Sequence, residues 1–291
     1  LSSFYWNRLL RVMPIYYFCL VAVLLILPLL IGQRLPTFGT TFHYWLYISN
    51  NTPALITPLY GTLEVTLGHF WSLGLEVQFY LLFPLLVITL SREKLTQTLL
   101  CIWAVVIITR SIAIYSGMST DSLFTNSVFR CDALILGALV AARRNLKIGS
   151  LFSAASFLAA GYLAYLVWFD YGSAIFKQEP LFYHHRALIP IAGSLLSAYA
   201  LALVLARNEI GVFYKSSILT FIAKYSYGIY IYHFIFNAYL QRALIPWLSD
   251  YLHSQNQVAF GFFLIQLCIS LVVAYVSYHM IEIHFLKLKR R

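Results

Sequence analysis

Long stretches without any charged side chain constrain this 291-residue chain most strongly. The clearest are residues 12–33, 148–169, 187–206, 225–241 and 251–281, the last with 31 uncharged residues in a row. Three more apolar stretches lie at about 68–90, 95–114 and 127–142, and the first and last of these enclose Glu76, Arg130 and Asp132. A membrane-spanning helix needs about 20 apolar residues, and helices satisfy their own backbone in lipid. The pattern predicts an all-α, polytopic transmembrane bundle of about eight spans.

Composition supports this prediction. The chain is 61% hydrophobic and 10% charged, whereas soluble domains are about 45–50% apolar and about 25% charged. No polar stretch is long enough to fold separately, so we expect one transmembrane domain over residues 1–291. The net charge of +10 includes no basic block of five, which argues against nucleic acid as a partner. Without paired spacing, the cysteines are expected to be buried thiols: Cys19, Cys101, Cys131 and Cys268.

The basic residues predict the orientation of the spans. With eight crossings, both ends lie on one side, and that side holds fourteen Lys and Arg residues against four on the other. Arg110 and Arg130 lie inside predicted spans. The positive-inside rule therefore places both ends of this chain in the cytoplasm. The segments 33–67 and 170–186 become the two longest outer loops.

One apolar stretch contains a histidine and a carboxylate. Ionisable groups near the bilayer centre cost at least ~2.5–3.5 kcal/mol, so they are candidates for function. His69, Ser72, Glu76 and Tyr80 recur at three- and four-residue spacings and share one helical face, with His69 at the outer mouth. A histidine and a carboxylate beside a cavity suit proton transfer from a hydroxyl. A polar seam between helices, with His69 merely interfacial, explains the same pattern.

Two other spans also contain polar side chains. Arg130 and Asp132 point to different sides of a helix, so each needs a partner on a neighbouring helix, or they meet where the helix start unwinds. Gly137 permits close helix packing nearby. Both a structural and a substrate-binding role fit this pair. A further polar stripe at helical spacing consists of Ser226, Tyr230, His233 and Asn237. It indicates either a water-filled cavity or core side chains whose hydrogen bonds are satisfied within the protein.

The ends of the chain bring charges to the membrane boundary. Glu282, at the cytoplasmic end of the last span, is expected to form a salt bridge with the nearby Lys and Arg residues. Arg8 and Arg11 precede the first predicted span, and their spacing stacks two guanidinium groups on one face, which suits a phosphate or pyrophosphate. Arginines at this boundary are also ordinary topology signals. The sequence has no Walker loop, dinucleotide fingerprint, zinc motif or serine nucleophile elbow.

In order along the chain, these segments resemble the acyltransferase-3 family of bacterial membrane O-acyltransferases, which includes O-antigen and Nod-factor acetylases. The matching pieces are residues 4–17, 69–84, 129–137, 225–233 and 277–282, and the most specific is the string Trp-Ser-Leu-x-x-Glu-x-Gln-Phe-Tyr at 71–80. Arg8 and Arg11 match the family's Arg-x-x-Arg, which is thought to engage the acyl donor. Glu76 matches the recurrent acid after Trp-Ser-Leu.

The resemblance implies a ten-helix core in the bacterial inner membrane. Such a core takes an acyl group, usually acetyl, from cytoplasmic acyl-CoA (acetyl-CoA) and needs no metal. The acceptor is a hydroxyl of a surface or lipid-linked glycan, as in modification of lipopolysaccharide O-antigen or exopolysaccharide. Val77 stands where the family commonly has a second Glu. The family's first two helices, which carry an Arg-(ten residues)-His element with the favoured catalytic base, are not found, so we expect an N-terminally truncated member.

The sequence therefore leads to one hypothesis and two alternatives. In the hypothesis, Glu76, His69 and His233 support proton transfer or acceptor binding in a membrane O-acyltransferase. Arg8 and Arg11 hold the CoA phosphates. Structural or substrate roles are expected for Arg130, Asp132, Ser72, Tyr80, Tyr230 and Glu282. The partners are a glycan and the lipid bilayer, and the oligomeric state stays open. A transporter or flippase for a lipid-linked glycan and an inactive truncated remnant are the alternatives, although the inverted repeats typical of transporters are not visible.

Overall fold

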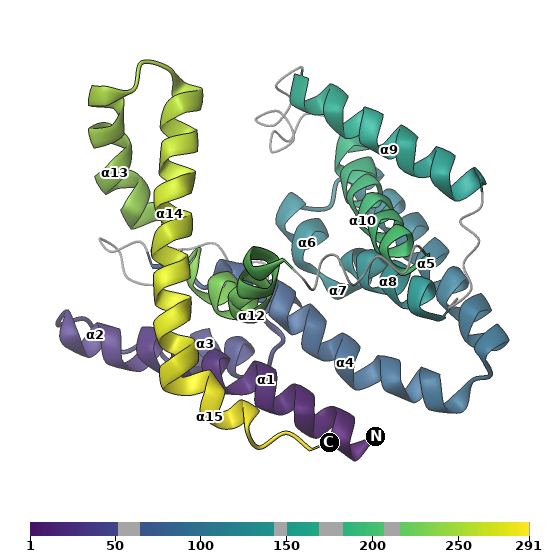
Figure 1. The fold of residues 1–291 in the computed structure, drawn as a ribbon, viewed down its shortest axis with the longest axis horizontal. Helices are drawn as coiled ribbons and strands as arrows, with labels where there is room; N and C mark the ends of the chain where they lie inside the picture. Colours follow the sequence, from purple (N-terminus) through teal and green to yellow (C-terminus); the bar gives the residue numbers. More distant parts are fainter. Residues whose placement is uncertain (52–64, 143–149, 169–182, 207–215, 291) are drawn as a thin grey trace. The chain divides into compact units, whose positions relative to one another are not determined.

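A computed structural model of the chain describes residues 1–51, 65–142, 150–168, 183–206 and 216–290 (Figure 1). All regular elements in these ranges are helical, which confirms the all-α prediction. They are α1 (Ser2–Val21), η1 (Ala22–Ile26), α2 (Leu27–Leu30), α3 (Phe38–Trp45), η2 (Ser49–Asn51), η4 (Gly68–Phe70), α4 (Trp71–Thr89), α5 (Arg92–Tyr115), α6 (Thr120–Thr125), α7 (Ser127–Arg130), α8 (Asp132–Ala142), α9 (Ser150–Trp168), α10 (Tyr183–Ala206), α12 (Ser217–Tyr232), α13 (Asn237–Tyr251), α14 (Gln255–Ser277), η6 (Tyr278–Glu282) and α15 (Ile283–Leu286).

Several of these helices are long and apolar enough to cross a membrane. Five reach that length within the described residues: Ser2–Leu30, Gly68–Thr89, Arg92–Tyr115, Leu188–Ala206 and Gln255–Leu286. Two more predicted spans correspond to shorter apolar helices, Asp132–Ala142 and Phe152–Leu166. Large apolar side chains such as Leu82 and Ile88 are exposed on α4, as expected for a surface that faces lipid. The chain is a multi-pass membrane protein. The predicted outer loop 33–67 contains α3 and η2 among its described residues, whereas the predicted loop 170–186 lies largely outside the described residues.

The predicted single span at 225–241 is wrong, because the structure divides it. α12 ends at Tyr232, residues 233–236 form a turn, and α13 begins at Asn237. Two carbonyl groups released by this turn have partners elsewhere. The Gln266 side-chain amide donates to the His233 carbonyl at 2.5 Å, and the Thr66 N–H donates to the Ile235 carbonyl at 3.2 Å. Since a backbone carbonyl in lipid must find a donor, these contacts stabilise the broken helix.

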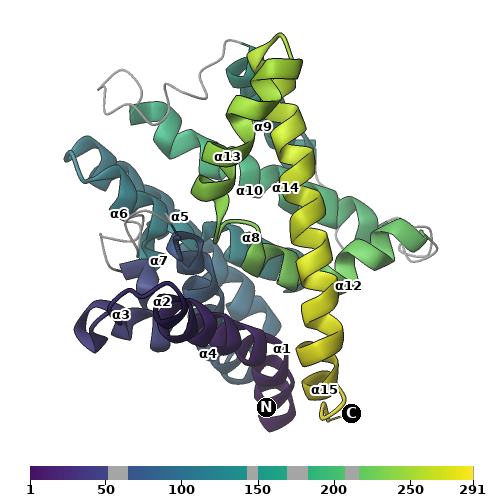
Figure 2. The ribbon, with the colours of Figure 1, turned by 90° about the vertical axis from the view of Figure 1, so that its left-hand side faces the viewer.

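The chain divides into two compact units, and the first consists of residues 1–49, 54–74 and 216–291. In this unit α12 and α13 each pack against α14, and α15 packs against α1. Figure 2 shows α13 beside α14, and both views place the two ends of the described chain next to each other. An aromatic core lies beside α1, where the Tyr16 ring stacks on Tyr47 at 4.0 Å and contacts Phe70 at 4.8 Å.

Close helix approach in this unit occurs at Gly228. A Cβ atom there would lie 3.0 Å from the Ala274 Cβ on α14, so only glycine lets the two helices pack at this distance. The sequence pointed instead to Gly137, and that expectation is wrong, because a Cβ at Gly137 would meet no atom of the described residues within 4 Å. The tight position belongs to α12, not to α8.

The second unit consists of residues 50–53 and 75–215. Its helices α5, α8, α9 and α10 pack against one another. The buried core is built from aliphatic side chains of α5, α8 and α10, including Leu99, Val106, Ile135, Leu139 and Ala202. Helix formation here follows from apolar composition and from capping, since the Ser91 side chain at the start of α5 accepts a hydrogen bond from the Lys94 N–H.

The four cysteines are free, as predicted, but they are not uniformly buried. Cys19 is buried and Cys131 is half-buried. Cys101 and Cys268 are exposed, which corrects the expectation that all four lie in the interior. Both exposed thiols lie on helices that are long enough to cross the membrane, where a weakly polar thiol is compatible with lipid.

Candidate functional site

The first unit contains a pocket lined by cationic side chains at its two chain ends. This terminal pocket has a volume of about 300 Å³ and is lined by Phe4, Asn7, Arg8, Arg11 and Lys289. Arg8 and Arg11 were expected to precede the first helix, whereas α1 begins at Ser2 and includes both. Their predicted shared face is confirmed, since both side chains line the same pocket. Neighbouring cationic groups in a pocket of this kind suit an anionic ligand.

A second cavity lies between α12 and α14 of the same unit. This histidine pocket has a volume of about 420 Å³, and its apolar lining residues are Ile222, Ile229, Phe263 and Leu267. Its polar lining residues are Ser226, Tyr230, His233, Gln266 and Ser270. The predicted cavity along the polar stripe is thereby confirmed for Ser226, Tyr230 and His233. Asn237 belongs to the next helix, where its side-chain oxygen accepts a hydrogen bond from Gln266 at 2.8 Å.

The hydrogen bonds of His233 define its chemistry. Its Nδ1 lies 2.7 Å from the carbonyl oxygen of Tyr230. A carbonyl only accepts, so Nδ1 carries a proton and donates it, and Nε2 is the ring nitrogen left for other partners. His233 follows the end of α12 as its C-cap and is the first residue of the turn, and it is half-buried. A histidine side chain that lines a cavity is a candidate for proton transfer.

His69 lies behind this cavity. It belongs to η4, the short 3-10 turn before α4, and is only 8% exposed. Its Nε2 donates to the carbonyl oxygen of Ile231 at 2.9 Å, and its ring meets the His233 ring edge-to-face with centroids 5.2 Å apart. The expected position of His69 at the outer mouth stays a prediction. His69 supports the end of α12 and the His233 ring, and its catalytic role stays a prediction.

Tyr230 links η4 and α4 to α12. Its hydroxyl donates to the His69 carbonyl at 3.0 Å and also hydrogen-bonds to the Ser72 hydroxyl. The helix α4 includes Ser72, Glu76 and Tyr80, at the helical spacing that the sequence predicted. Within the second unit the predicted pairing is confirmed, since the Tyr80 hydroxyl donates to Glu76 Oε1. The structure does not bring Glu76 into the histidine pocket's lining.

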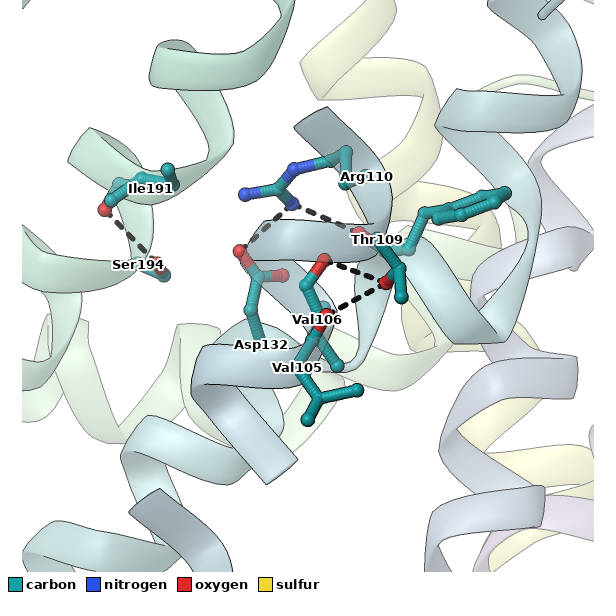
Figure 3. A network of polar contacts seen from close by, with 8 residues as sticks. Val105, Val106, Thr109, Arg110, Asp132, Ile191 and Ser194 are labelled. Atoms are coloured by element: carbon teal, nitrogen blue, oxygen red, sulfur yellow. Dashed lines mark hydrogen bonds and ion pairs between the residues drawn. The ribbon is translucent and has the colours of Figure 1, made fainter. Parts of the chain in front are cut away.

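The second unit has a buried ion pair. Arg110 Nη1 on α5 lies 3.0 Å from Asp132 Oδ2 on α8, and both side chains are 2% exposed. Figure 3 shows the guanidinium of Arg110 directed at this carboxylate. Asp132 follows a helix break at Cys131, and the Arg130 guanidinium lies 4.9 Å from the Phe124 ring centroid. The prediction that Arg130 and Asp132 need separate partners is confirmed, and the sequence did not identify Arg110 as one of them.

Glu282 differs from its prediction. It belongs to the π-helical turn η6 and is 6% exposed. It forms no salt bridge with any described Lys or Arg, and its Oε1 has no hydrogen-bond partner in that part of the chain. It lies near enough to Arg11 for an electrostatic attraction. The carboxylate thus faces the arginine of α1 rather than the basic residues that follow it.

Some residues near these sites were missed by sequence reasoning. Lys289 was counted only as a topology signal, and Gln266 was not considered. In the second unit a buried amide pair was also missed, in which Gln78 Nε2 donates to Asn50 Oδ1 at 2.9 Å. Ser127 donates to Gln78 Oε1 at 2.5 Å and completes this cluster. The Trp-Ser-Leu-x-x-Glu-x-Gln string was the available signal for Gln78. The partners of Gln78, Asn50 and Ser127, are remote from it in sequence.

Comparison with known proteins identifies the domain. The model of a family described as "Acyltransferase domain" matches residues 1–279. The chain belongs to this family. Two similar proteins come from Staphylococcus aureus. Putative O-acetyltransferase SACOL0978 of strain COL is 25% identical over 99% of this chain and 48% of its own length. O-acetyltransferase OatA of strain NCTC 8325 / PS 47 is 23% identical over 97% of this chain and 47% of its own length.

The chain thus spans about half the length of the curated relatives that it matches. No solved structure shows a significant match. The acyltransferase family gives the two pockets of the first unit a chemical context. The terminal pocket can hold an anion, and the histidine pocket has a group that can transfer a proton.

Proposed function

We propose that this chain is the membrane domain of an O-acyltransferase that moves an acyl group, acetyl by preference, from cytoplasmic acyl-CoA to a hydroxyl of a cell-surface or lipid-linked glycan. The observation that carries the proposal is the presence of both pockets in one compact unit of an acyltransferase-family chain. Within that unit α1 and α12 are joined directly, since the Tyr227 hydroxyl donates to the Val12 carbonyl at 2.8 Å.

Each pocket supplies one half of the chemistry. Arg8 and Arg11 bind phosphate groups of the donor through charge-assisted hydrogen bonds. A base removes the proton of the acceptor hydroxyl, whose oxygen forms a bond to the thioester carbonyl carbon. The carbon–sulfur bond then breaks, and CoA leaves as the thiol. We propose His233 as a supporting base on the acceptor side. Glu76 is proposed to assist proton transfer.

The remaining polar residues are proposed to organise these groups. His69, Ser72 and Tyr230 hold the end of α12 and with it the ring of His233. Asp132 and Arg130 order the second unit. The orientation proposed from the basic residues puts the terminal pocket at the cytoplasmic face of a bacterial inner membrane, where acyl-CoA is available. This orientation explains why the cationic residues lie at the chain ends.

Transfer of labelled acetyl groups tests the proposal. The natural gene, including whatever coding sequence precedes Leu1, is expressed in a strain that lacks it, and membranes are supplied with radiolabelled acetyl-CoA. We expect label in surface glycan with the wild-type protein. Arg11→Ala is expected to raise the KM for acetyl-CoA, and His233→Gln and Glu76→Gln are expected to lower kcat.

Matched controls make the result specific. Arg242→Ala removes an equal charge outside the terminal pocket, and His253→Gln removes an exposed histidine outside the histidine pocket. Both are expected to retain transfer. Full transfer in Arg11→Ala and in His233→Gln would refute the residue assignments. Label-free glycan with a well-expressed wild-type protein would refute the proposed function itself.

A further inference from the structure

The C-terminal tail is fastened to the first turns of α1. The Asn7 side chain forms two hydrogen bonds with the backbone of Arg290, donating to its carbonyl at 2.8 Å and accepting from its N–H at 2.9 Å. Trp6 Nε1 donates to the Leu288 carbonyl at 3.1 Å, and the Arg290 guanidinium lies 5.4 Å from the Trp6 ring centroid. These contacts fix the backbone on both sides of one residue, Lys289.

This fastening directs Lys289 into the terminal pocket, where Arg8 and Arg11 already lie. Partial burial, and then the positive charges of Arg11 and Arg8, lower the pKa of the Lys289 ammonium. Glu282 attracts Arg11 but does not line the pocket. Three cations therefore share a pocket of about 300 Å³, and none of the described residues that line it is acidic.

Three like charges in one pocket repel one another, and an exposed lysine can turn toward solvent to avoid this. Here the Asn7 and Trp6 contacts hold the backbone on both sides of Lys289, so the lysine stays beside the pocket. Such an arrangement is favourable when an anion with more than one charge occupies the pocket. A phosphate monoester or a pyrophosphate meets this requirement, because each offers several oxygen acceptors to the cations.

We propose that Lys289, positioned by Asn7, is a third cation for the phosphate groups of the acyl donor, so that the C-terminal tail is part of the donor site. This inference rests on the proposed function for the identity of the anion. Lys289 supplies an ammonium to a phosphate oxygen, and Asn7 acts through Lys289 by holding the Arg290 backbone.

The test compares Lys289→Ala, Lys289→Arg and Lys287→Ala in the full-length protein in nanodiscs. Lys287→Ala removes an equal charge from the same tail outside the pocket lining. A lost charge-assisted hydrogen bond corresponds to a loss of affinity of about tenfold or more. We therefore expect Lys289→Ala to raise the KM for acetyl-CoA and the Kd for CoA by about tenfold, with kcat unchanged. Lys289→Arg is expected to restore most of the affinity, and Lys287→Ala to leave it intact.

A double substitution tests the positioning role of Asn7. Asn7→Ala is expected to weaken CoA binding in the wild-type background and to have no further effect in Lys289→Ala, because its influence passes through the lysine. An equal, independent loss in both backgrounds would overturn the positioning role. The bound anion is identified with 3′-dephospho-CoA: a smaller effect of Lys289→Ala assigns the 3′-phosphate, and an unchanged effect assigns the pyrophosphate.

An anionic lipid headgroup offers the same phosphate chemistry to Lys289. Two further measurements distinguish it from CoA as the bound anion. CoA binding is measured in nanodiscs with and without phosphatidylglycerol, and lipid retention is measured for each variant. Lipid retention that depends on Lys289 while CoA binding does not would overturn the proposal. The Kd for CoA is measured directly, so it decides the role of Lys289 even when no acetyl transfer is detected. An absence of acetyl transfer would refute only the proposed function.

Discussion

Arg110 and Asp132 illustrate how strongly a single residue depends on its partner in this protein. Both side chains are almost fully buried, and Arg110 Nε and Nη2 have no hydrogen-bond partner among the described residues. The guanidinium is satisfied only by Asp132 and by the Phe129 carbonyl, which lies 2.9 Å from Nη1. Removing one member of such a pair leaves an uncompensated buried charge, which costs more than the intact pair contributes.

We therefore predict that Asp132→Asn lowers the free energy of unfolding by about 3–5 kcal/mol. The exposed Asp250 provides the control, and Asp250→Asn is expected to change stability by less than about 0.5 kcal/mol. Thermal unfolding in detergent measures both. Replacing both partners, as in Arg110→Met with Asp132→Leu, is expected to recover much of the loss. Equal melting temperatures for Asp132→Asn and Asp250→Asn would contradict this account.

The role proposed for Lys289 predicts that donor binding depends on pH. The pKa of Lys289 is lowered from an ordinary value near 10.5 by partial burial and by Arg11 and Arg8. The ammonium binds phosphate, so its contribution is complete below the lowered pKa and is lost as the pH rises through it. As the pH rises, we predict that the wild type begins to lose CoA affinity at a lower pH than Lys289→Arg, because the arginine keeps its charge. Titration calorimetry between about pH 7.5 and 10 checks this, and parallel curves would count against it.

The same pKa shift affects stability in the ligand-free protein, with the opposite sign. Between the lowered folded pKa and the unfolded value, the unfolded chain binds more protons than the folded one, so stability rises with pH in that window. Lys289→Ala is accordingly expected not to lower the melting temperature at neutral pH, although it weakens donor binding. A clear drop in melting temperature would indicate a structural role for the lysine instead.

At the scale of elements, the approach of α12 to α14 depends on the absence of one carbon atom. An alanine Cβ at position 228 would lie 3.0 Å from the Ala274 Cβ and 3.3 Å from its Cα. Since backbone cannot move aside easily, we predict that Gly228→Ala destabilises the protein by about 1–3 kcal/mol and reduces acetyl transfer. Gly137→Ala is the matched control, because it meets nothing within 4 Å. Melting temperatures of the two variants decide between a packing effect and a general effect of alanine.

The helices themselves were predictable, whereas their interruptions and partners were not. The length of the apolar stretches locates α1, α4, α5, α10 and α14, because the bilayer sets that length. The turn at 233–236 has no Pro or Gly to announce it, and it depends on Gln266 and Thr66, which are far away in sequence. Arg8 and Arg11 were found because i, i+3 spacing is local. Arg110 and Lys289 joined their sites only through tertiary contacts, which no local pattern contains.

For the whole molecule, the basic residues predict the side on which each end of the chain lies. Fourteen Lys and Arg residues on one side against four on the other predict cytoplasmic ends. Reporter fusions after Arg291 test this directly. A green fluorescent protein fused there is expected to fluoresce, and alkaline phosphatase fused there is expected to be inactive. Active phosphatase would place the tail outside and would separate Lys289 from cytoplasmic acyl-CoA.

The broken helix at 233–236 has a consequence for the order of assembly during synthesis. The His233 carbonyl depends on Gln266, which follows it by 33 residues. Ribosomes add about 5–20 residues per second, so the carbonyl emerges roughly two to seven seconds before its donor exists. During that interval the half-formed turn has to remain in contact with water or with the insertion machinery. The cavity around His233 therefore closes late, when α14 enters the membrane and brings Gln266 with it.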